Sequence, residues 1–99
     1  MRMMLSVTMP IEPFNSAVRD GTAGQKIGRI MEAIKPEAAY FTEQNGHRSG
    51  IFIVNVSDAS QIPALAEPFF LTFNADVQFK IAMTPEDLGK ANLDQFRKW

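Results

Sequence analysis

A two-residue turn in the middle of the chain constrains the fold more than any other feature. Asn45-Gly46 separates two strand-like runs, Ala38–Gln44 and His47–Val56. Asn and Gly both tolerate positive φ, which a type I′ turn requires at its two central positions. The two runs are therefore predicted to form an antiparallel hairpin. The predicted pairs are Gln44 with His47, Glu43 with Arg48, Thr42 with Ser49, Phe41 with Gly50, Tyr40 with Ile51 and Ala39 with Phe52.

Helices and strands alternate around this hairpin. Apolar residues at every second position predict strands, and apolar residues three and four apart predict helices. Thr22 with Gln25 and Asp58 with Gln61 have capping-box spacing, and Thr84 precedes a proline at a helix start. The predicted elements are a strand over Met3–Met9, a short helix ending at Asp20-Gly21, a helix from Ala23 to Lys35, the hairpin, a helix after Asp58 that kinks or ends at Pro68, a strand over Val77–Met83 and a short helix from Thr84 to about Ala91.

The order strand, helix, hairpin, helix, strand predicts an α+β fold of the ferredoxin-like kind, a β-α-β-β-α-β sandwich. Both helices are expected on one face of a four-stranded antiparallel sheet, and right-handed crossovers place the first and third strands at its centre. One domain is predicted over residues 1–91, followed by a C-terminal tail over residues 92–99. Phe96 and Trp99 in that tail are expected either to be disordered or to pack across a dimer.

Composition excludes several classes of function. The chain has 99 residues, a formal net charge of −1 and scattered basic residues, so neither nucleic acid nor a membrane surface is an expected partner. It contains no cysteine, which excludes disulfides and thiolate chemistry and is compatible with the reducing cytoplasm. No stretch approaches the length of a membrane span. A cytoplasmic protein is therefore expected.

The strand alternation divides the sheet into two unlike faces. One face is the predicted core, and it consists of Met3, Leu5, Val7, Met9, Phe41, Phe52, Val54, Val56, Val77, Phe79 and Ile81. The other face carries Met4, Ser6, Thr8, Tyr40, Thr42, Ile51, Ile53, Asn55, Gln78, Lys80 and Ala82. This second face is too apolar for water and too polar for a core. Because both helices are used on the core side, a second copy of the protein is the simplest cover.

Several segments resemble small uncharacterised bacterial proteins of the dimeric α/β-barrel type. These are Lys35–Phe41, the helix start Asp58–Pro63, Ala66–Phe70 and Met83–Leu88. The resemblance implies a barrel-like homodimer without an assigned activity. The wider superfamily includes cofactor-independent monooxygenases, muconolactone-type isomerases and haem-handling proteins. No catalytic residue of those enzymes can be matched to a position in this chain, and no cofactor is predicted.

The mixed face holds the candidate site, because two such faces would enclose a space lined by a few polar groups. The catalytic candidates are Tyr40, Asn55 and Lys80, and the predicted ligand-binding set is Ser6, Thr8, Tyr40, Thr42, Ile51, Ile53, Asn55, Gln78 and Lys80. A polar trio of this kind can orient a carbonyl or a phenol. Alternatively, these groups hydrogen-bond across a dimer interface and bind nothing.

Other polar residues are expected to be structural. His47 is the only histidine and falls at the hairpin tip, so it is interpreted as a solvated turn residue. No acidic residue has metal-ligand spacing to it, and no metal site is predicted. Glu43 and Arg48 are expected to form a cross-strand ion pair.

Three functions remain open at the level of sequence. The first is a homodimer that binds a small, partly apolar ligand between facing sheets. The second is a cofactor-independent monooxygenase or isomerase acting on a small aromatic-like substrate. The third is a structural dimer whose interior is filled by side chains. An enclosed volume on which Tyr40, Asn55 or Lys80 converge would separate the first two from the third.

Overall fold

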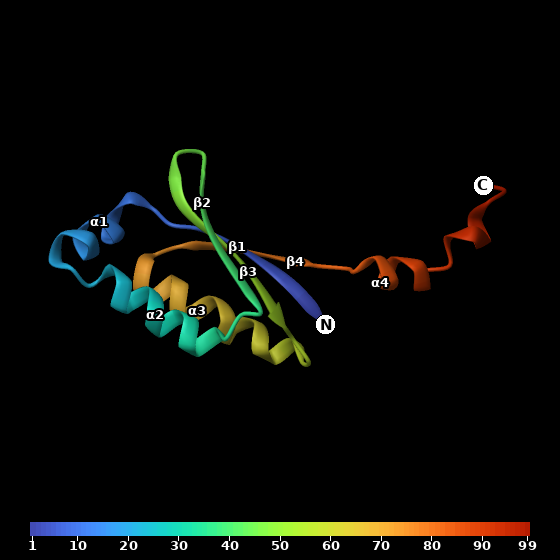
Figure 1. The fold of residues 1–99 in the computed structure, drawn as a ribbon, viewed down its shortest axis with the longest axis horizontal. Helices are drawn as coiled ribbons and strands as arrows, with labels where there is room; N and C mark the ends of the chain where they lie inside the picture. Colours follow the sequence, from blue (N-terminus) through green and yellow to red (C-terminus); the bar gives the residue numbers. More distant parts are fainter.

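The computed structural model describes residues 1–99 and shows a four-stranded antiparallel sheet with helices packed on one side (Figure 1). The elements in chain order are β1 (Arg2–Thr8), α1 (Ile11–Asp20), α2 (Ala23–Ile34), β2 (Ala38–Gln44), β3 (His47–Asn55), a 3-10 turn (Ala59–Gln61), α3 (Ile62–Phe73), β4 (Asp76–Ile81), α4 (Pro85–Lys90) and a second 3-10 turn (Leu93–Phe96). None of the helices combines the length and the apolar character needed to cross a membrane.

The hairpin has the predicted turn and register. Asn45 and Gly46 have φ values of 52° and 79°, so both lie in the left-handed region that a type I′ turn needs. Every predicted pair is observed, from Gln44 opposite His47 to Ala39 opposite Phe52. The two-residue turn therefore determines which side chains of β2 and β3 share a face.

The strands lie in the order β2-β3-β1-β4, and all neighbours are antiparallel. The first and third strands are central, as predicted. Helices α2 and α3 lie side by side against one face of this sheet, and α1 joins them at one end (Figure 1). The opposite face has no helix over it.

Two helix boundaries follow from residues with left-handed backbone. Gly21, with φ of 80°, ends α1, and Lys35, with φ of 46°, ends α2 just before Pro36. The predicted capping box of Thr22 is wrong. The hydroxyl and the backbone N–H of Thr22 both donate to Asp20 Oδ1, at 2.5 and 2.9 Å. These hydrogen bonds hold the pKa of the Asp20 carboxyl below its usual value, and they engage the hydroxyl that a capping box would need.

The capping box predicted at Asp58 is confirmed, and so is the cap at Thr84. Asp58 opens the 3-10 turn that leads into α3, and Thr84 exchanges hydrogen bonds with Asp87 at the start of α4. A kink or an early end of the helix is expected at Pro68. Helix α3 does not end there but continues through this proline to Phe73. Pro68 leaves only the carbonyl of exposed Ala64 without its helical partner, and water can satisfy that group.

The core lies between the sheet and the helices and contains most of the predicted residues. The buried side chains include Met3, Leu5, Val7, Met9, Phe52, Val54 and Val56 from the strands and Phe14, Ile30, Ile34, Phe69 and Phe73 from the helices. Two predicted core residues are exposed instead: Phe41 at 56% and Ile81 at 61%. Both belong to edge strands and lie beyond the part of the sheet that the helices cover, although Phe41 still meets the ring of Phe52 edge-on at 5.7 Å.

Residues 82–99, which include α4, form an extension that we call the C-terminal arm. It leaves the body at the end of β4 and projects along the long axis of the molecule (Figure 1). The protein measures 60 × 28 × 19 Å and has a radius of gyration of 16.7 Å. A compact chain of this length would have a radius of gyration of about 13 Å. Helix α4 therefore lies with the tail and outside the sheet and helix layers.

Gly50 provides a test of core packing. A Cβ atom at this position would lie 2.6 Å from Cζ of Phe52, whose ring is fully buried. Gly50→Ala should lower the free energy of unfolding by about 1–3 kcal/mol because the ring cannot move without strain. Gly28→Ala, at an exposed site of α2 with open space around it, should raise that free energy by about 0.5–1 kcal/mol. Urea unfolding measures both, and effects of the same sign would contradict this packing.

Candidate functional site

The candidate site lies on the sheet face that no helix covers, which we call the free face. The register aligns its side chains in rows across the strands. The central row is Ala38, Ile53, Met4 and Lys80, and its neighbours are Tyr40, Ile51, Ser6 and Gln78 on one side and Asn55 with Arg2 on the other. The next row beyond Tyr40 is Thr42, Ser49, Thr8 and Asp76. All of the predicted ligand-binding residues therefore occur on this one face.

The centre of the free face is apolar. Met4, Ile51 and Ile53 lie on the two central strands and are half-buried by their neighbours. Tyr40 adjoins them from β2, and its side chain is 63% exposed. Side chains of this kind on the middle strands of a sheet normally face another layer of protein.

One end of the free face is closed by a residue that was not predicted. The side-chain amide of Gln44 donates to Oγ of Ser6 at 3.1 Å, and its carbonyl oxygen accepts from the hydroxyl of Thr8 at 3.0 Å. Because β3 lies between β2 and β1, the Gln44 side chain crosses over β3 to make these contacts. Ser49 of β3 lies at this place and is only 1% exposed. The end of the hairpin thus covers the Ser6 and Thr8 hydroxyls.

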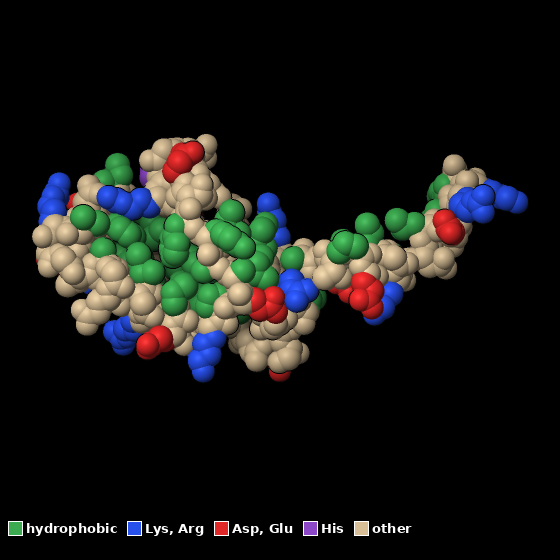
Figure 2. All heavy atoms as spheres, in the orientation of Figure 1, with side chains coloured by type: hydrophobic (Ala, Val, Ile, Leu, Met, Phe, Trp, Pro, Cys, Tyr) green, Lys and Arg blue, Asp and Glu red, His purple; other side chains and the backbone are tan.

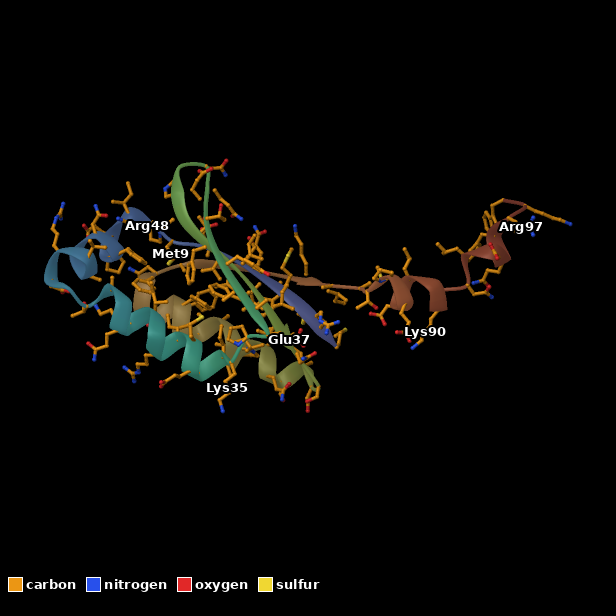
Figure 3. All side chains as sticks on the ribbon, in the orientation of Figure 1. Met9, Lys35, Glu37, Arg48, Lys90 and Arg97 are labelled. Carbon is orange, nitrogen blue, oxygen red and sulfur yellow. The ribbon has the colours of Figure 1, made fainter.

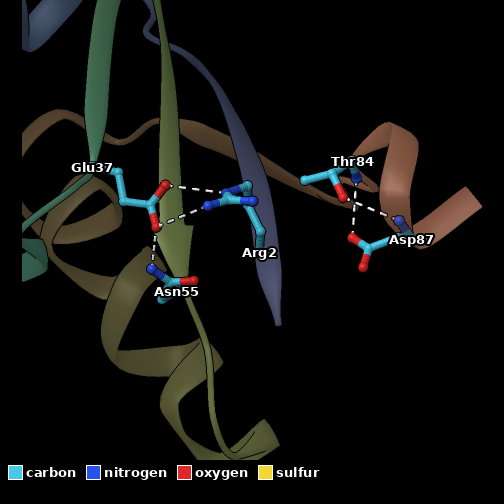
Figure 4. A network of polar contacts seen from close by, with 5 residues as sticks. All are labelled: Arg2, Glu37, Asn55, Thr84 and Asp87. Atoms are coloured by element: carbon cyan, nitrogen blue, oxygen red, sulfur yellow. Dashed lines mark hydrogen bonds and ion pairs between the residues drawn. The ribbon is translucent and has the colours of Figure 1, made fainter.

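The other end of the free face carries a charged network (Figure 4). The Arg2 guanidinium donates to both carboxylate oxygens of Glu37, at 3.1 and 3.5 Å, and the Asn55 amide donates to the same carboxylate. The hydrogen bond from Arg2, followed by that from Asn55, holds the pKa of the Glu37 carboxyl below its usual value of 4.5. The candidate residue Asn55 is therefore engaged within its own chain.

The three catalytic candidates share the free face but do not converge. Tyr40 belongs to the edge strand β2 and Lys80 to the opposite edge strand β4. Three strand spacings separate them, which is roughly 14 Å. Neither the Tyr40 hydroxyl nor the Lys80 ammonium makes a hydrogen bond or ion pair within the chain. A ligand contacting both would need a second molecule to bring these groups together.

The free face of a single copy contains no cavity. Thr42 and Gln78 are exposed on the free face, and Thr8, Ser6, Ile51 and Ile53 are half-buried there. The concave regions of the chain lie elsewhere: within the C-terminal arm, between α2 and α3, and beside the 3-10 turn after β3. A single copy thus presents the free face as an open surface.

The residues interpreted as structural lie away from this face. His47 is exposed at the hairpin tip, with Nδ1 3.2 Å from the Asn45 carbonyl oxygen. The predicted ion pair between Glu43 and Arg48 is wrong. The Glu43 carboxylate accepts from the Gly46 backbone N–H at 2.9 Å, and the Arg48 guanidinium lies 4.6 Å from the centre of the Phe14 ring. No group of three or more His, Asp or Glu side chains is arranged to hold a metal ion.

Sequence reasoning missed Gln44, Arg2 and Glu37, although part of the signal was present. Arg2 lies directly opposite Asn55 in the β1–β3 register. The backbone N–H of Glu37 donates to the Ile53 carbonyl, so Glu37 extends the pairing of β2 with β3. Gln44 reaches across a whole strand, and a pattern of alternation contains no information about such a contact. Along the strand direction, the free face therefore has a polar end at Gln44, an apolar centre and a charged end at Glu37.

The Glu37 network predicts a dependence of stability on pH. Because the folded pKa lies below the ordinary 4.5, the ionised carboxylate stabilises the fold above that pH, and this contribution is lost as the pH falls from 4.5 through the folded pKa. Glu37→Gln should therefore be less stable than the natural chain at pH 7, and the difference should shrink on acidification. Urea unfolding of both proteins at pH 7 and in acid measures this difference in the free energy of unfolding. A difference that persists in acid, or an NMR titration of Glu37 at or above 4.5, would contradict the network.

Comparison with known proteins adds no family to this description. A search against protein-family models found no match, and neither did a search of curated proteins. The α+β architecture and the geometry of the free face are thus the basis for any statement about function.

Proposed function

We propose that this protein is a homodimer that binds a small, partly apolar ligand between two facing sheets. In this proposal the fold is ferredoxin-like and the dimer is an α/β barrel of the kind found in the bacterial proteins that the sequence resembles. The central position of β1 and β3 and the one-sided helix layer support the fold. The observation that carries the dimer is the uncovered apolar centre of the free face, formed by Met4, Ile51 and Ile53.

Burial of apolar surface would stabilise the proposed dimer. Apolar area removed from water contributes roughly 25 cal/mol per Å², and the free face offers its apolar side chains on the two rigid central strands. A second copy related by a two-fold axis presents the same patch, so the two patches are complementary without further design. The polar and charged ends would then lie at the rim, where hydrated groups are tolerated.

The same arrangement accounts for the separated candidates. A two-fold dimer that sets β2 of one copy beside β4 of the other brings Tyr40 of the first copy near Lys80 of the second. Each dimer would contain two such pairs, each at one edge of an apolar space. A phenol hydroxyl and an ammonium group suit a ligand with a carbonyl, carboxylate or phenolate on an apolar body.

A second candidate function is catalysis by a cofactor-independent monooxygenase or isomerase. The observation that favours it is that Lys80 is the one basic side chain on the free face that makes no ion pair in its own chain, whereas Arg2 pairs with Glu37. An ammonium group of this kind can stabilise an enolate or phenolate that develops during a reaction. The ligand-binding proposal requires Tyr40 and Lys80 but no turnover.

The dimer is tested by placing a charge at the centre of the free face. Ile53→Glu should give a monomer or insoluble protein because it buries a carboxylate without a partner. Val18→Glu makes the same change at an exposed position of α1 and should leave the dimer intact. Sedimentation gives the mass of each variant, and circular dichroism confirms that it is folded. An unchanged dimer of Ile53→Glu would show that the free face is not the dimer interface. A natural protein that is monomeric would overturn the proposal.

The ligand is tested by native mass spectrometry of protein purified from its host. A dimer that retains an additional small mass is expected. Tyr40→Phe and Lys80→Met should each reduce the retained mass several-fold, whereas Lys35→Met, at the end of α2, should not. Retention unchanged in both site variants would rule out this assignment, and a dimer that never carries an added mass would favour a filled, structural interior.

A further inference from the structure

The C-terminal arm carries large apolar side chains that are exposed to solvent. The exposed fractions are 65% for Met83, 50% for Leu88, 59% for Leu93, 47% for Phe96 and 98% for Trp99. Phe96 and Trp99 lie against each other, with ring centres 6.0 Å apart. Figure 3 shows Lys90 and Arg97 along this arm, well separated from the labelled residues of the body. Apolar exposure on this scale is typical of a surface that packs against another molecule.

The helix in the arm, α4, is too short to be stable without packing against another surface. Helix α4 has a capping box and an ion pair between Lys90 and Glu86 at 3.5 Å, but it contains only six residues. Isolated helices shorter than about 12 residues are marginal in water. Packing against another surface would supply the missing stabilisation.

The body has a second apolar surface without a partner, which we call the flank. It consists of Ala39 and Phe41, which are exposed on the helix side of β2. On the same side of the sheet, Ile27 and Met31 of α2 are only partly buried against the core. Phe41 lies on the helix side of β2 and is nevertheless 56% exposed. The sheet therefore overhangs the helix layer at β2. Figure 2 shows hydrophobic side chains gathered across the body between α2 and the hairpin.

We propose that the C-terminal arm of one copy covers the flank of a second copy, so that the two subunits exchange arms. This inference rests on the proposed dimer. In that dimer β4 of one copy lies beside β2 of the other, and the arm is the direct continuation of β4. The arm of one subunit would therefore run past the edge strand of its partner, at the place where the helix layer leaves that strand open.

The direction of the arm favours a partner over its own body. The Ala82 backbone N–H donates to the Arg2 carbonyl at 3.0 Å, which extends the β4 pairing by one residue and directs the arm away from the sheet. The flank of the same chain lies at the opposite edge, beyond β1 and β3. Reaching it would require the arm to reverse its direction and cross the width of the sheet.

Charge and area are both suitable for a protein surface. The arm carries three acidic and three basic side chains, Glu86, Asp87, Asp94, Lys90, Arg97 and Lys98, so it has no net attraction for an anionic membrane. Trp99 would bury on the order of 150–250 Å², and Phe96, which is 47% exposed, would bury roughly half as much. Two exchanged arms would thus add on the order of 450–750 Å² from these rings alone, a substantial part of the roughly 1,200–2,000 Å² that stable interfaces bury.

Trp99 is the only tryptophan, so its fluorescence reports the position of the arm directly. In the dimer, its emission should be blue-shifted and shielded from acrylamide, and both properties should be lost on dilution to monomer. Phe41→Lys should expose Trp99 in the dimer. Val18→Lys, which places the same charge on α1, should not.

Mixing two variants distinguishes exchange between copies from folding within one copy. One partner carries Trp99→Phe with an intact flank, and the other carries Phe41→Lys with Trp99 present. If arms are exchanged, the tryptophan of the second variant becomes shielded when the first is added. If the arm folds onto its own chain, that tryptophan stays exposed after mixing, and the inference is overturned.

The remaining outcomes separate this inference from the proposed function. A dimer in which Trp99 is fully exposed would overturn arm exchange and leave the dimer in place. Shielding that is insensitive to Phe41→Lys would overturn the flank as the docking surface. Shielding that occurs only after addition of phosphatidylcholine and phosphatidylglycerol vesicles would assign the arm to a lipid surface instead. A monomer at all concentrations would overturn both proposals.

Discussion

The two-residue turn at Asn45-Gly46 is the constraint on which the rest of the structure depends. Positive φ at both residues gives the hairpin a single register, and that register assigns each side chain of β2 and β3 to a face. A slip by one residue would move Phe52 and Val54 out of the core and bring Ile51 and Ile53 into it. The identity of the free face, and with it the candidate site, follows from this local geometry.

The helix layer is narrower than the sheet, and this mismatch explains the exposed apolar residues on the helix side of the edge strands. The central strands are buried on the helix side, whereas Phe41 on one edge strand and Ile81 on the other are exposed. The free face has no cover, and the arm has no support within its own chain. These three surfaces are separate places on the molecule, yet one two-fold assembly would accommodate all of them.

Patterns that repeat along the chain predicted the fold well. Alternation and turn chemistry determine the strands, their register and the buried central residues, because each depends only on neighbours in sequence or on a known pairing. Two predictions were wrong because another group engages the side chain: the Asp20 carboxylate accepts from the hydroxyl of Thr22, and the Phe14 ring contacts the guanidinium of Arg48. The early end considered at Pro68 does not occur, because α3 continues to Phe73. The contacts of Gln44 and the direction of the arm depend on tertiary geometry, which alternation does not encode.

The two edge strands have a consequence for assembly. β2 has seven residues and β4 has six, so each presents a similar length of unpaired backbone N–H and C=O groups. When two different edge strands pair between copies, the assembly either closes as a dimer or grows indefinitely by adding further copies. The segments that follow the strands decide which of the two forms. In the proposed dimer, the projecting segment at the end of β4 would obstruct the addition of a third molecule in line. The same extension that leaves the isolated chain elongated would thus act as a terminator, limiting the assembly to a closed pair and preventing growth into a fibre.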